Sequence, residues 1–482
     1  TAVNTSGTLG TANFTQTSVN YDPNGQFESL DEGATTTDSF EYTISDGDGG
    51  SATGSVTVTI HGQNDAPVAY SDSSSTNEND AVTIDVLAND SDVDTGDNRS
   101  NFSLDDATIV STTGLSGAPT DAGSASIVNN QLLFDPGSDY DELAVGETAT
   151  VTIDYTMSDD SGSSSASTAV VTIHGTNDAP VITSLNSSHP TPDANSTDGQ
   201  VTIDGSFMDL DLTDVHSVTV DWGDGSPVEP VSVDQDADTF AGMHPYATGG
   251  IFTITVTVDD GNGDVDIQTT SAATQGVGMV DGVLYIIGTD GRDHVNLRFN
   301  ERNDELKVDV KLDQGSGPNI NDTFDIHAVE QVVAYLFGGD DHYNGDGKGG
   351  NGESDAAAEI PQFVFGGDGN DHLFGGNGSD VLSGGAGADD LFGRSGSDIL
   401  VGGLGRDNVK GGADDDLLIG GATESENNLA LIEAALADWS NQDIVATLDD
   451  LGTVTDDGDK DDLKGEAGVD HLVGGTGDKL QQ

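Results

Sequence analysis

The sequence predicts an all-β chain in which tandem β-sandwiches are followed by a parallel β-roll with one short helical insertion. Three observations predict this fold class: β-branched strands alternate with Asp/Gly turns in the first half, a nine-residue unit rich in Gly and Asp recurs in the second, and one stretch near residue 430 has apolar residues at helical spacing. The 482 residues include 65 Gly and only 5% aromatic residues, which favours many small β units over one large core.

The charge and composition exclude several classes of function. With 13 Lys and Arg against 87 Asp and Glu, the net charge is −74, so nucleic acids and anionic membranes are not expected partners. The absence of Cys excludes disulfides, thiolate zinc sites and cysteine nucleophiles. No apolar run approaches the roughly 18 residues of a membrane span, and residues 1–14 lack signal-peptide features. We therefore expect a soluble segment, with no direct membrane insertion, whose export signal lies outside it.

The first half contains a long internal repeat. Its equivalent residues Asn64 and Asn177 are 113 positions apart, a sandwich-sized period. The repeat resembles the cadherin-like VCBS repeats of large bacterial surface proteins, because it shares their terminal Asn-Asp-Ala-Pro (64–67 and 177–180) and an early Leu-Ala-Asn-Asp-Ser-Asp-Val-Asp (87–94). The resemblance implies a complete repeat over residues 66–178 and a partial one over 1–65.

The partial repeat begins after the point where a Leu-Ala-Asn-Asp motif would stand. Either the chain is cut from a longer protein or a neighbouring chain supplies the missing strands. The first alternative is favoured, because an open sheet edge promotes aggregation and a mature protein normally covers it.

Residues 179–275 have a different pattern, with Trp222-Gly-Asp-Gly, His244-Pro-Tyr and a run of alternating β-branched residues over 250–258. They resemble a PKD domain, an immunoglobulin-like sandwich. We expect Trp222 to fill the core of this sandwich rather than to bind a ligand, because a Trp beside alternating strands usually does so.

The composition changes near residue 291, before which 47 acidic residues accompany a single basic one, Arg99. We interpret residues 276–365 as irregular coils that lead into the roll. Over residues 366–421, six consecutive nine-residue units follow the pattern Gly-Gly-x-Gly-x-Asp-x-apolar-x, which is the calcium-binding repeat of RTX proteins. The Asp positions and the apolar positions keep the nine-residue register throughout.

The spacing of the units predicts where calcium binds. A six-residue turn and a three-residue strand make half a coil, so aspartates 18 residues apart stack at about the 4.8 Å strand separation. Such carboxylates repel unless a cation lies between them, and with turn carbonyls they supply the six or seven oxygens that Ca²⁺ takes. Glycine allows the turn to direct its carbonyls at the metal. Because the apolar column is thin, we expect calcium binding to be coupled to folding.

The predicted ligand groups of the roll are the repeated aspartates, the first and fourth glycines of three units, and polar residues at the third position. Isolated units at 288–296 and 465–473 add one aspartate each. The set is Asp293, Asp371, Asp380, Asp389, Asp398, Asp407, Asp416, Asp470, Gly366, Gly369, Gly375, Gly378, Gly384, Gly387, Asp368 and Asn377.

The end of the roll is expected to be irregular. Residues 465–482 hold a final good unit, followed by one with Lys479 where the ligand should stand, which we interpret as a cap. Residues 422–464 interrupt the array, and the spacing of Leu429, Ile432, Leu436 and Trp439 predicts a helix over about 427–439. This helix could cap or pack on the roll, which we favour, or bind a partner.

A second set of acids resembles the motifs with which cadherin junctions hold calcium. It comprises Glu78, Asp80, Asp90, Asp92 and Asp94 with the linker acids Asp65 and Asp178. The resemblance implies calcium ligands at Glu78, Asp92 and Asp94, against the alternative of solvated turns. Asp46-Gly-Asp48, Asp159-Asp160 and Asp259-Asp260 are interpreted as hairpin turns.

The sequence contains none of the usual catalytic motifs, its ten His are scattered, and His61 and His174 fill one repeat position, so we predict no enzyme. The favoured function is that of a secreted or cell-surface structural or adhesive protein that depends on Ca²⁺. Copies of itself or surface and matrix polymers are its expected partners, and a lattice or fibre is one possible assembly. The alternative is the non-catalytic accessory region of a secreted hydrolase, and a calcium buffer is less favoured.

Overall fold

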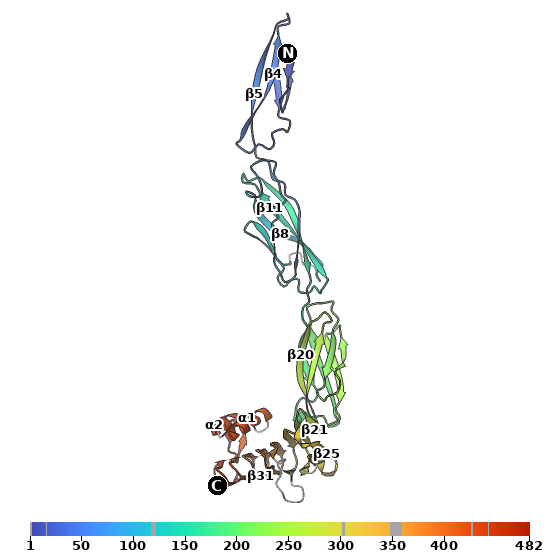
Figure 1. The fold of residues 1–482 in the computed structure, drawn as a ribbon, viewed down its shortest axis with the longest axis vertical. Helices are drawn as coiled ribbons and strands as arrows, with labels where there is room; N and C mark the ends of the chain where they lie inside the picture. The colour runs from blue at the N-terminus through green and yellow to red at the C-terminus, as the bar shows by residue number, and fades with distance from the viewer. Residues whose placement is uncertain are drawn as a thin grey trace. The chain divides into compact units, whose positions relative to one another are not determined.

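The structure is a computed structural model that describes residues 2–15, 17–116, 122–300, 304–347, 359–425, 428–441 and 443–482. The chain divides into two compact units. One comprises Thr1–Pro180, Asp209–Val215 and Asp259–Val265, and the other comprises Val181–Met208, His216–Val258 and Asp266–Gln482. Nearly every regular element is a strand (Figure 1), which confirms the predicted all-β class.

The N-terminal repeat is built around a long antiparallel hairpin of β4 and β5, with β1 paired to β4 and a separate β2–β3 sheet. Phe40 is buried on this hairpin, whereas Phe14 and Ile44 remain exposed, so the core of this repeat is small among the described residues. The strands are β1 Ala2–Asn4, β2 Thr11–Phe14, β3 Val19–Asp22, β4 Thr35–Ser45 and β5 Ser51–His61.

The second repeat is a sandwich of a three-stranded sheet, β7-β10-β9, and a four-stranded sheet, β6-β12-β11-β8. Alternate residues of the strands point inward, and Phe102, Phe134, Tyr140 and Tyr155 fill the core at 2% exposure or less. Strand β6 pairs in parallel with β12, while the other pairs are antiparallel. The strands are β6 Asp72–Asn77, β7 Val82–Ile84, β8 Ser103–Thr113, β9 Ser124–Val128, β10 Gln131–Asp135, β11 Thr148–Ser158 and β12 Ser164–His174.

The third sandwich has two four-stranded sheets, β13-β14-β18-β17 and β16-β15-β19-β20. Trp222 is fully buried between them, its ring stacks on His244 at 5.0 Å, and its carbonyl accepts the hydroxyl of Tyr246 at 2.8 Å. The prediction that Trp222 is a core residue is therefore confirmed. The elements are β13 Val181–Ser187, a 3-10 turn Pro192–Ala194, β14 Gln200–Met208, β15 Ser217–Asp221, β16 Glu229–Pro230, β17 Ser232–Asp234, β18 Thr239–Pro245, β19 Gly250–Asp259 and β20 Val265–Thr274.

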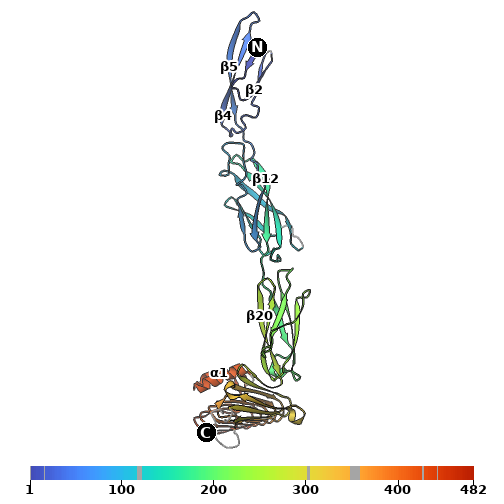
Figure 2. The same ribbon diagram turned by 45° about the vertical axis from the view of Figure 1, so that its right-hand side comes forward.

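The C-terminal part is a roll of two sheets with eight and nine strands, whose strands lie side by side in Figure 2. Strands 18 residues apart pair in parallel and in register, as the nine-residue period requires. One buried Leu or Val from each half coil forms the inner column. The strands are β26 Gln331–Phe337, β27 His342–Gly347, β28 Gln362–Asp368, β29 His372–Phe374, β30 Val381–Ala386, β31 Asp390–Ser395, β32 Ile399–Leu404, β33 Asn408–Ala413, β34 Leu417–Ile419, β37 Asp462–Ala467, β38 His471–Val473 and β39 Lys479–Gln481.

The start of the roll is partly antiparallel. Strands β23, β24 and β25 form an antiparallel meander, and β21 pairs with β22 in the same way, before the parallel coils begin. These hairpins provide the edge on which the first parallel strands pair. The elements are β21 Gly276–Val280, β22 Val283–Thr289, β23 His294–Asn300, β24 Glu305–Lys311, β25 Asn319–Asp325, and the 3-10 turns Leu312–Gly315 and Ile326–Ala328.

The insertion folds into two helices, α1 Leu429–Ser440 and α2 Ile444–Leu451, with the short strands β35 Ala422–Thr423 and β36 Val454–Thr455. Helix α1 begins at Asn428, whose side chain accepts the N–H of Leu431. Ile432, Leu436 and Trp439 pack with the outer apolar side chains of the eight-stranded sheet, so the helix covers the roll as predicted (Figure 2). Helix α2 was not predicted, because its eight residues begin with β-branched Ile444 and Val445.

Candidate metal centres

Two rows of aspartates run along the edges of the roll. Within each row the backbone N–H of one aspartate donates to Oδ1 of the next, as from Asp371 to Asp389 at 2.8 Å and from Asp380 to Asp398 at 2.8 Å. The first row is Asp293, Asp341, Asp371, Asp389, Asp407, Asp461 and Asp478, and the second is Asp380, Asp398, Asp416 and Asp470. The structure thus brings eight of the nine sequence-predicted roll aspartates into the two rows, and Asp368 lies outside them.

The second oxygen of six of these carboxylates has no hydrogen-bond partner among the residues that the structure describes. These are the Oδ2 atoms of Asp341, Asp371, Asp389, Asp398, Asp407 and Asp416, and each side chain is at most 2% exposed. A buried, unpartnered carboxylate oxygen costs several kcal/mol unless a proton or a cation satisfies it. The rows therefore provide oxygen atoms that are directed and desolvated but unsatisfied by the protein, which is the arrangement a hard cation requires.

Burial and neighbouring carboxylates perturb the acidity of both rows. They raise the pKa of Asp341, Asp389 and Asp416 to about 8 and that of Asp407 to about 7, with burial as the larger cause. Without a cation these groups hold protons near neutral pH. A bound divalent cation favours the charged form and so reverses the shift.

The glycines leave room for the carboxylates and for the turns. A Cβ at Gly366 or Gly384 would collide with Oδ2 of Asp371 or Asp389, respectively, and one at Gly387 would collide with the carbonyl of Gly369 one coil earlier. Gly387 also adopts φ +151°, and Gly369 adopts φ +146°. The first and fourth glycines of the repeat are thus required for the packing of the edge.

Some predicted ligands differ from the rest. Both oxygens of Asp293 accept protein donors, from Thr289 at 2.7 and 2.9 Å and from the N–H of Asp313 at 2.8 Å. The carboxylate of Asp380 likewise accepts two N–H groups, from Gly376 and Gln362. Asp368 has an exposed side chain, and Asn377 is half-buried.

The last unit requires a correction. The sequence suggested that Lys479 occupies the ligand position, but Asp478 does, since the N–H of Asp461 donates to its Oδ1 at 3.1 Å. Lys479 instead contacts Asp462 on the neighbouring strand at 3.2 Å. The row continues because the turn is one residue shorter here, a slip that a strict nine-residue register does not detect.

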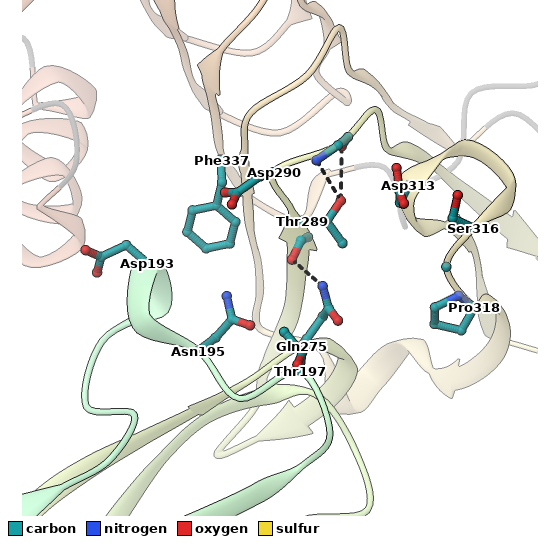
Figure 3. Close-up of a pocket in the computed structure, with 13 residues that line it drawn as sticks. Asp193, Asn195, Thr197, Gln275, Thr289, Asp290, Asp313, Ser316, Pro318 and Phe337 are labelled. Atoms are coloured by element: carbon teal, nitrogen blue, oxygen red, sulfur yellow. Dashed lines mark hydrogen bonds between the residues drawn. The ribbon is translucent and has the colours of Figure 1, made fainter.

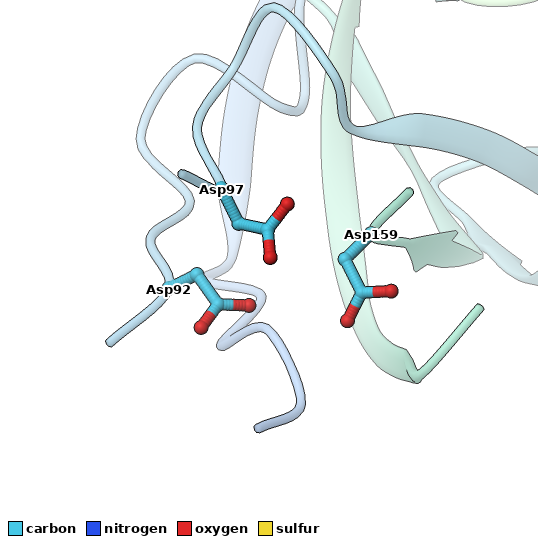
Figure 4. Close-up of side chains that lie close together, drawn as sticks. All are labelled: Asp92, Asp97 and Asp159. Carbon is cyan, nitrogen blue, oxygen red and sulfur yellow. The ribbon is translucent and has the colours of Figure 1, made fainter. Parts of the chain in front are cut away.

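A separate acid cluster lies at the start of the second repeat. Carboxylate oxygens of Asp92, Asp97 and Asp159 lie within 4.8 Å of one another (Figure 4). Asp94 is 1% exposed, its Oδ2 accepts the N–H of Asp65 at 2.8 Å, and its Oδ1 has no partner. The structure therefore places the predicted ligands Asp92 and Asp94 together with the linker. It also adds Asp97, which was not predicted as a ligand, and Asp159, which was interpreted only as a turn residue.

The third sandwich carries the same cluster. Asp209, Asp214 and Asp260 lie within 4.8 Å of one another, and Oδ2 of Asp211 accepts the N–H of Asp178 at 2.9 Å. Asp211 is 2% exposed with an unpartnered Oδ1, and burial raises its pKa to about 6. Sequence analysis missed these residues. The signal that could have found them is the shared Asp-x-Asp-x-x-Asp spacing at 92–97 and 209–214, each downstream of Asn-Asp-Ala-Pro.

Glu78 lies apart from the residues with which it was grouped. It is fully buried, its Oε1 accepts the N–H of Thr176 at 2.6 Å, and its Oε2 has no partner. Burial and the charges of Asp178 and Asp141 raise its pKa. Glu78 therefore lies near the linker acid Asp178 at the end of the second repeat, and not near Asp92 and Asp94. The reason is that β6 runs parallel to β12, so the residue after β6 lies at the end of the sandwich where β12 also ends.

Comparisons with known families agree with this arrangement. The sequence matches the family models of the bacterial Ig domain at residues 1–59 and 64–174, the PKD domain at 177–275, and the RTX calcium-binding nonapeptide repeat at 365–400 and 392–423. The chain is therefore modular, with bacterial Ig and PKD modules and with RTX repeats through which it binds Ca²⁺. None of these family models describes a catalytic domain.

Similar solved structures include cadherin ectodomains and a bacterial adhesin. Protocadherin GammaB4 is 10% identical over 60% of this chain and 54% of that chain with a TM-score of 0.33, and mouse cadherin-23 EC22-24 is 17% identical over 54% and 79% with a TM-score of 0.31. A Ca²⁺-stabilised adhesin with which an Antarctic bacterium binds ice is 15% identical over 64% and 75% with a TM-score of 0.21.

The chain spans about half the length of the human desmocollin-1 ectodomain (53%) and of protocadherin GammaB4 (54%). Likenesses at these scores support no conclusion about function. No curated protein matches the sequence. In the described part of the chain, no helix combines the length and the apolar character needed to cross a membrane.

Proposed function

We propose that this chain is an extracellular spacer and adhesive segment in which Ca²⁺ takes the place of a large apolar core. The observation that carries the proposal is the set of six buried Oδ2 atoms without a partner along the roll. Because adjacent carboxylates share one edge, each cation between two of them removes their repulsion and satisfies both oxygens. The ligands are the row aspartates, with the turn carbonyls beside them.

The two acid clusters of the sandwiches extend the proposal to the linkers. Each unites an Asp-x-Asp pair, a third Asp, a turn Asp and the Asn-Asp of the preceding linker, and each contains a nearly fully buried aspartate with an unpartnered oxygen, Asp94 or Asp211. A cation held there would fix the linker to the sandwich that follows it. Free linkers between domains otherwise allow domain motion, so such ions would stiffen the chain.

The dependence on calcium also suggests where the chain works. Calcium is scarce in the cytosol and abundant outside the cell, so a chain with net charge −74 stays unfolded in its roll until it is exported. Folding outside the cell then follows from ion binding. The same ions could join copies of the chain into a lattice or fibre, and matrix polymers are the other expected partners.

The direct test is a circular dichroism spectrum of the chain with calcium and with chelator. At a pH above about 8, where protons no longer replace the ion on the row carboxylates, we expect the β signal of the roll to disappear in chelator and to return with Ca²⁺. Asp389→Asn should weaken the response, whereas Asp390→Asn, one residue away and half exposed on the outer face, should not. A spectrum that chelator leaves unchanged would rule out the proposal.

The alternative, an accessory region of a secreted hydrolase, shares the calcium-bound roll. It differs in requiring a catalytic domain elsewhere in the gene product. Reading the complete open reading frame distinguishes the two.

A further inference from the structure

Two adjoining cavities lie where the third sandwich meets the first coils of the roll. Their volumes are about 650 and 470 Å³, and both are lined by Asp193 and Phe337. Each falls in the range of roughly 300–1,000 Å³ that is usual for sites of small ligands. Figure 3 shows the side chains of Asp193, Asn195, Asp290 and Phe337 around the larger cavity.

One wall of this cleft is aromatic. The rings of Tyr335 and Phe365 stack with their centroids 4.8 Å apart and an interplanar angle of 13°. The ring centroid of Phe337 lies 6.3 Å from that of Tyr335, with an interplanar angle of 17°. Phe365 is buried at 4% exposure, while Tyr335 and Phe337 are half-buried and line the smaller cavity. Helices α1 and α2 pack on the apolar side chains farther along this sheet. The three rings therefore offer a row of parallel aromatic groups at its beginning.

The backbone at Phe337 is strained. Its φ is +68°, a value that a bulky side chain rarely adopts. The turn after β26 holds the residue in this conformation, in which its ring lines both cavities. Strain of this kind is common at binding sites, where it holds a side chain in the position that contact with a ligand requires.

The rest of the lining is polar and acidic. Asp193, Asp290 and Asp313 contribute carboxylates, and Asn195 and Gln275 contribute amides. The amide of Gln275 is oriented by donating to the carbonyl of Gly288 at 3.0 Å, as Figure 3 shows. No Lys, Arg or His is among the described residues that line the two cavities.

From this chemistry we propose that the cleft binds a neutral oligosaccharide. The carboxylates repel anionic ligands, since no basic side chain lines the cavities to offset them. Carboxylate and amide groups accept and donate hydrogen bonds to hydroxyl groups, and the flat rings pack against the C–H face of a sugar. A chain of several sugar units would lie across both cavities, which share a boundary at Phe337.

This site adds a ligand to the proposed function and does not use the calcium rows. The test is binding of the full chain, in calcium, to immobilised cellohexaose, maltohexaose, laminarihexaose and chitohexaose, with an oligogalacturonate of equal length as the anionic probe. We expect saturable binding of at least one neutral probe and none of the oligogalacturonate. Failure of every neutral probe to bind would overturn the proposal, as would preferred binding of the anionic one.

Three variants locate the site. Phe337→Gly removes the ring and also the backbone strain, so it should lower the affinity about tenfold or more without destabilising the roll. Asp290→Ala should reduce binding through the polar part of the lining. Phe374→Ala, which removes an aromatic ring from the other sheet of the roll, should leave binding unchanged.

Equal affinity of Phe337→Gly and the unaltered chain would overturn the assignment. A circular dichroism spectrum of each sample in calcium shows that the roll is folded during the binding test. The two proposals can then fail separately, because a roll that keeps its β signal in chelator refutes the proposed function and does not affect the binding of sugar to the cleft.

Discussion

The second sandwich and the nonapeptide part of the roll use different interiors to hold the same kind of secondary structure. In the sandwich, large side chains such as Phe134, Tyr140 and Ile153 form one core at 0% exposure. In the roll, each half coil contributes one small aliphatic residue to the inner column, and each also buries one aspartate. The sandwich is therefore stabilised by apolar burial, whereas the roll contains as many buried acids as column residues and, on the proposed function, is stabilised by Ca²⁺.

The roll is not without other support. Its eight-stranded sheet carries a second apolar layer on the outside, in which Phe363, Ile399 and Leu417 pack with the insertion helices. That layer covers one face only, while the carboxylates lie along both edges. Apolar burial therefore fixes where the strands pack, and on the proposed function the charge state of the edges decides whether the coils form.

Chelation should separate the two regions most strongly. At a pH above about 8, where the row carboxylates no longer hold protons, removal of Ca²⁺ leaves the six unpartnered carboxylates of the roll uncompensated, but it leaves the sandwich core unchanged. In hydrogen exchange, we expect residues 363–419 to lose protection completely in chelator while residues 148–174 stay protected. Protection of both segments in chelator would break the comparison.

Acid should partly replace calcium. The pKa of Asp389 and Asp416 is about 8 in the folded roll without metal, above the ordinary value of 3.8. Because the folded state holds these protons more tightly than the unfolded chain, the stability that they contribute is fully present at a pH below 3.8 and is lost as the pH rises towards 8. In chelator, the β signal of the roll should therefore grow as the pH falls from about 8 to 5. With calcium present, we expect the opposite trend, because protons compete with the ion for the carboxylates. A β signal in chelator that does not change with pH would contradict the prediction.

A cavity in the sandwich should cost stability without regard to calcium. Ile153 is fully buried, so Ile153→Ala should lower the free energy of unfolding of this domain by about 2–5 kcal/mol. Urea denaturation followed by the protection of residues 148–174 gives the value in calcium and in chelator. The loss of unfolding free energy in calcium should equal the loss in chelator. A loss that appears only in chelator would show that the ions, not the apolar core, hold this domain.

Much of this contrast could be predicted from the sequence, because the nine-residue period states the position of every row aspartate from Asp371 to Asp416. Periodicity also identified α1 and the alternating strands. A strict register did not assign Asp341 and Asp478 to the first row, because they follow a shortened unit and a short turn. Asp461 does keep the register, 54 residues after Asp407, but its unit lacks the first two glycines of the repeat and so was not recognised.

The junction clusters show the same limit. Asp159 is read from sequence as part of a hairpin turn, and it is one, since its Oδ1 accepts the N–H groups of Gly162 and Ser163. Its other oxygen accepts the side-chain amide of Asn64, 95 residues earlier. A residue can serve a turn and a binding cluster at once, and local sequence shows only the first role. Glu78 was misplaced for a related reason, because proximity in sequence to Asp90–Asp94 does not follow the path of β6.

The smallest expected effect concerns the second cluster, where one carboxylate among several is removed. Asp211→Asn keeps the shape of the side chain and removes a buried charge with an unpartnered oxygen, so the cation should bind more weakly there by about 1–3 kcal/mol. Calcium should then protect the linker 177–180 from proteolysis only at higher concentration, while the roll responds to calcium as before. Asp236→Asn, at an exposed turn of the same sandwich, is the matched control and should behave like the unaltered chain. If Asp211→Asn leaves the calcium dependence of linker protection unchanged, the cluster is a solvated set of turns, and only the roll depends on the ion.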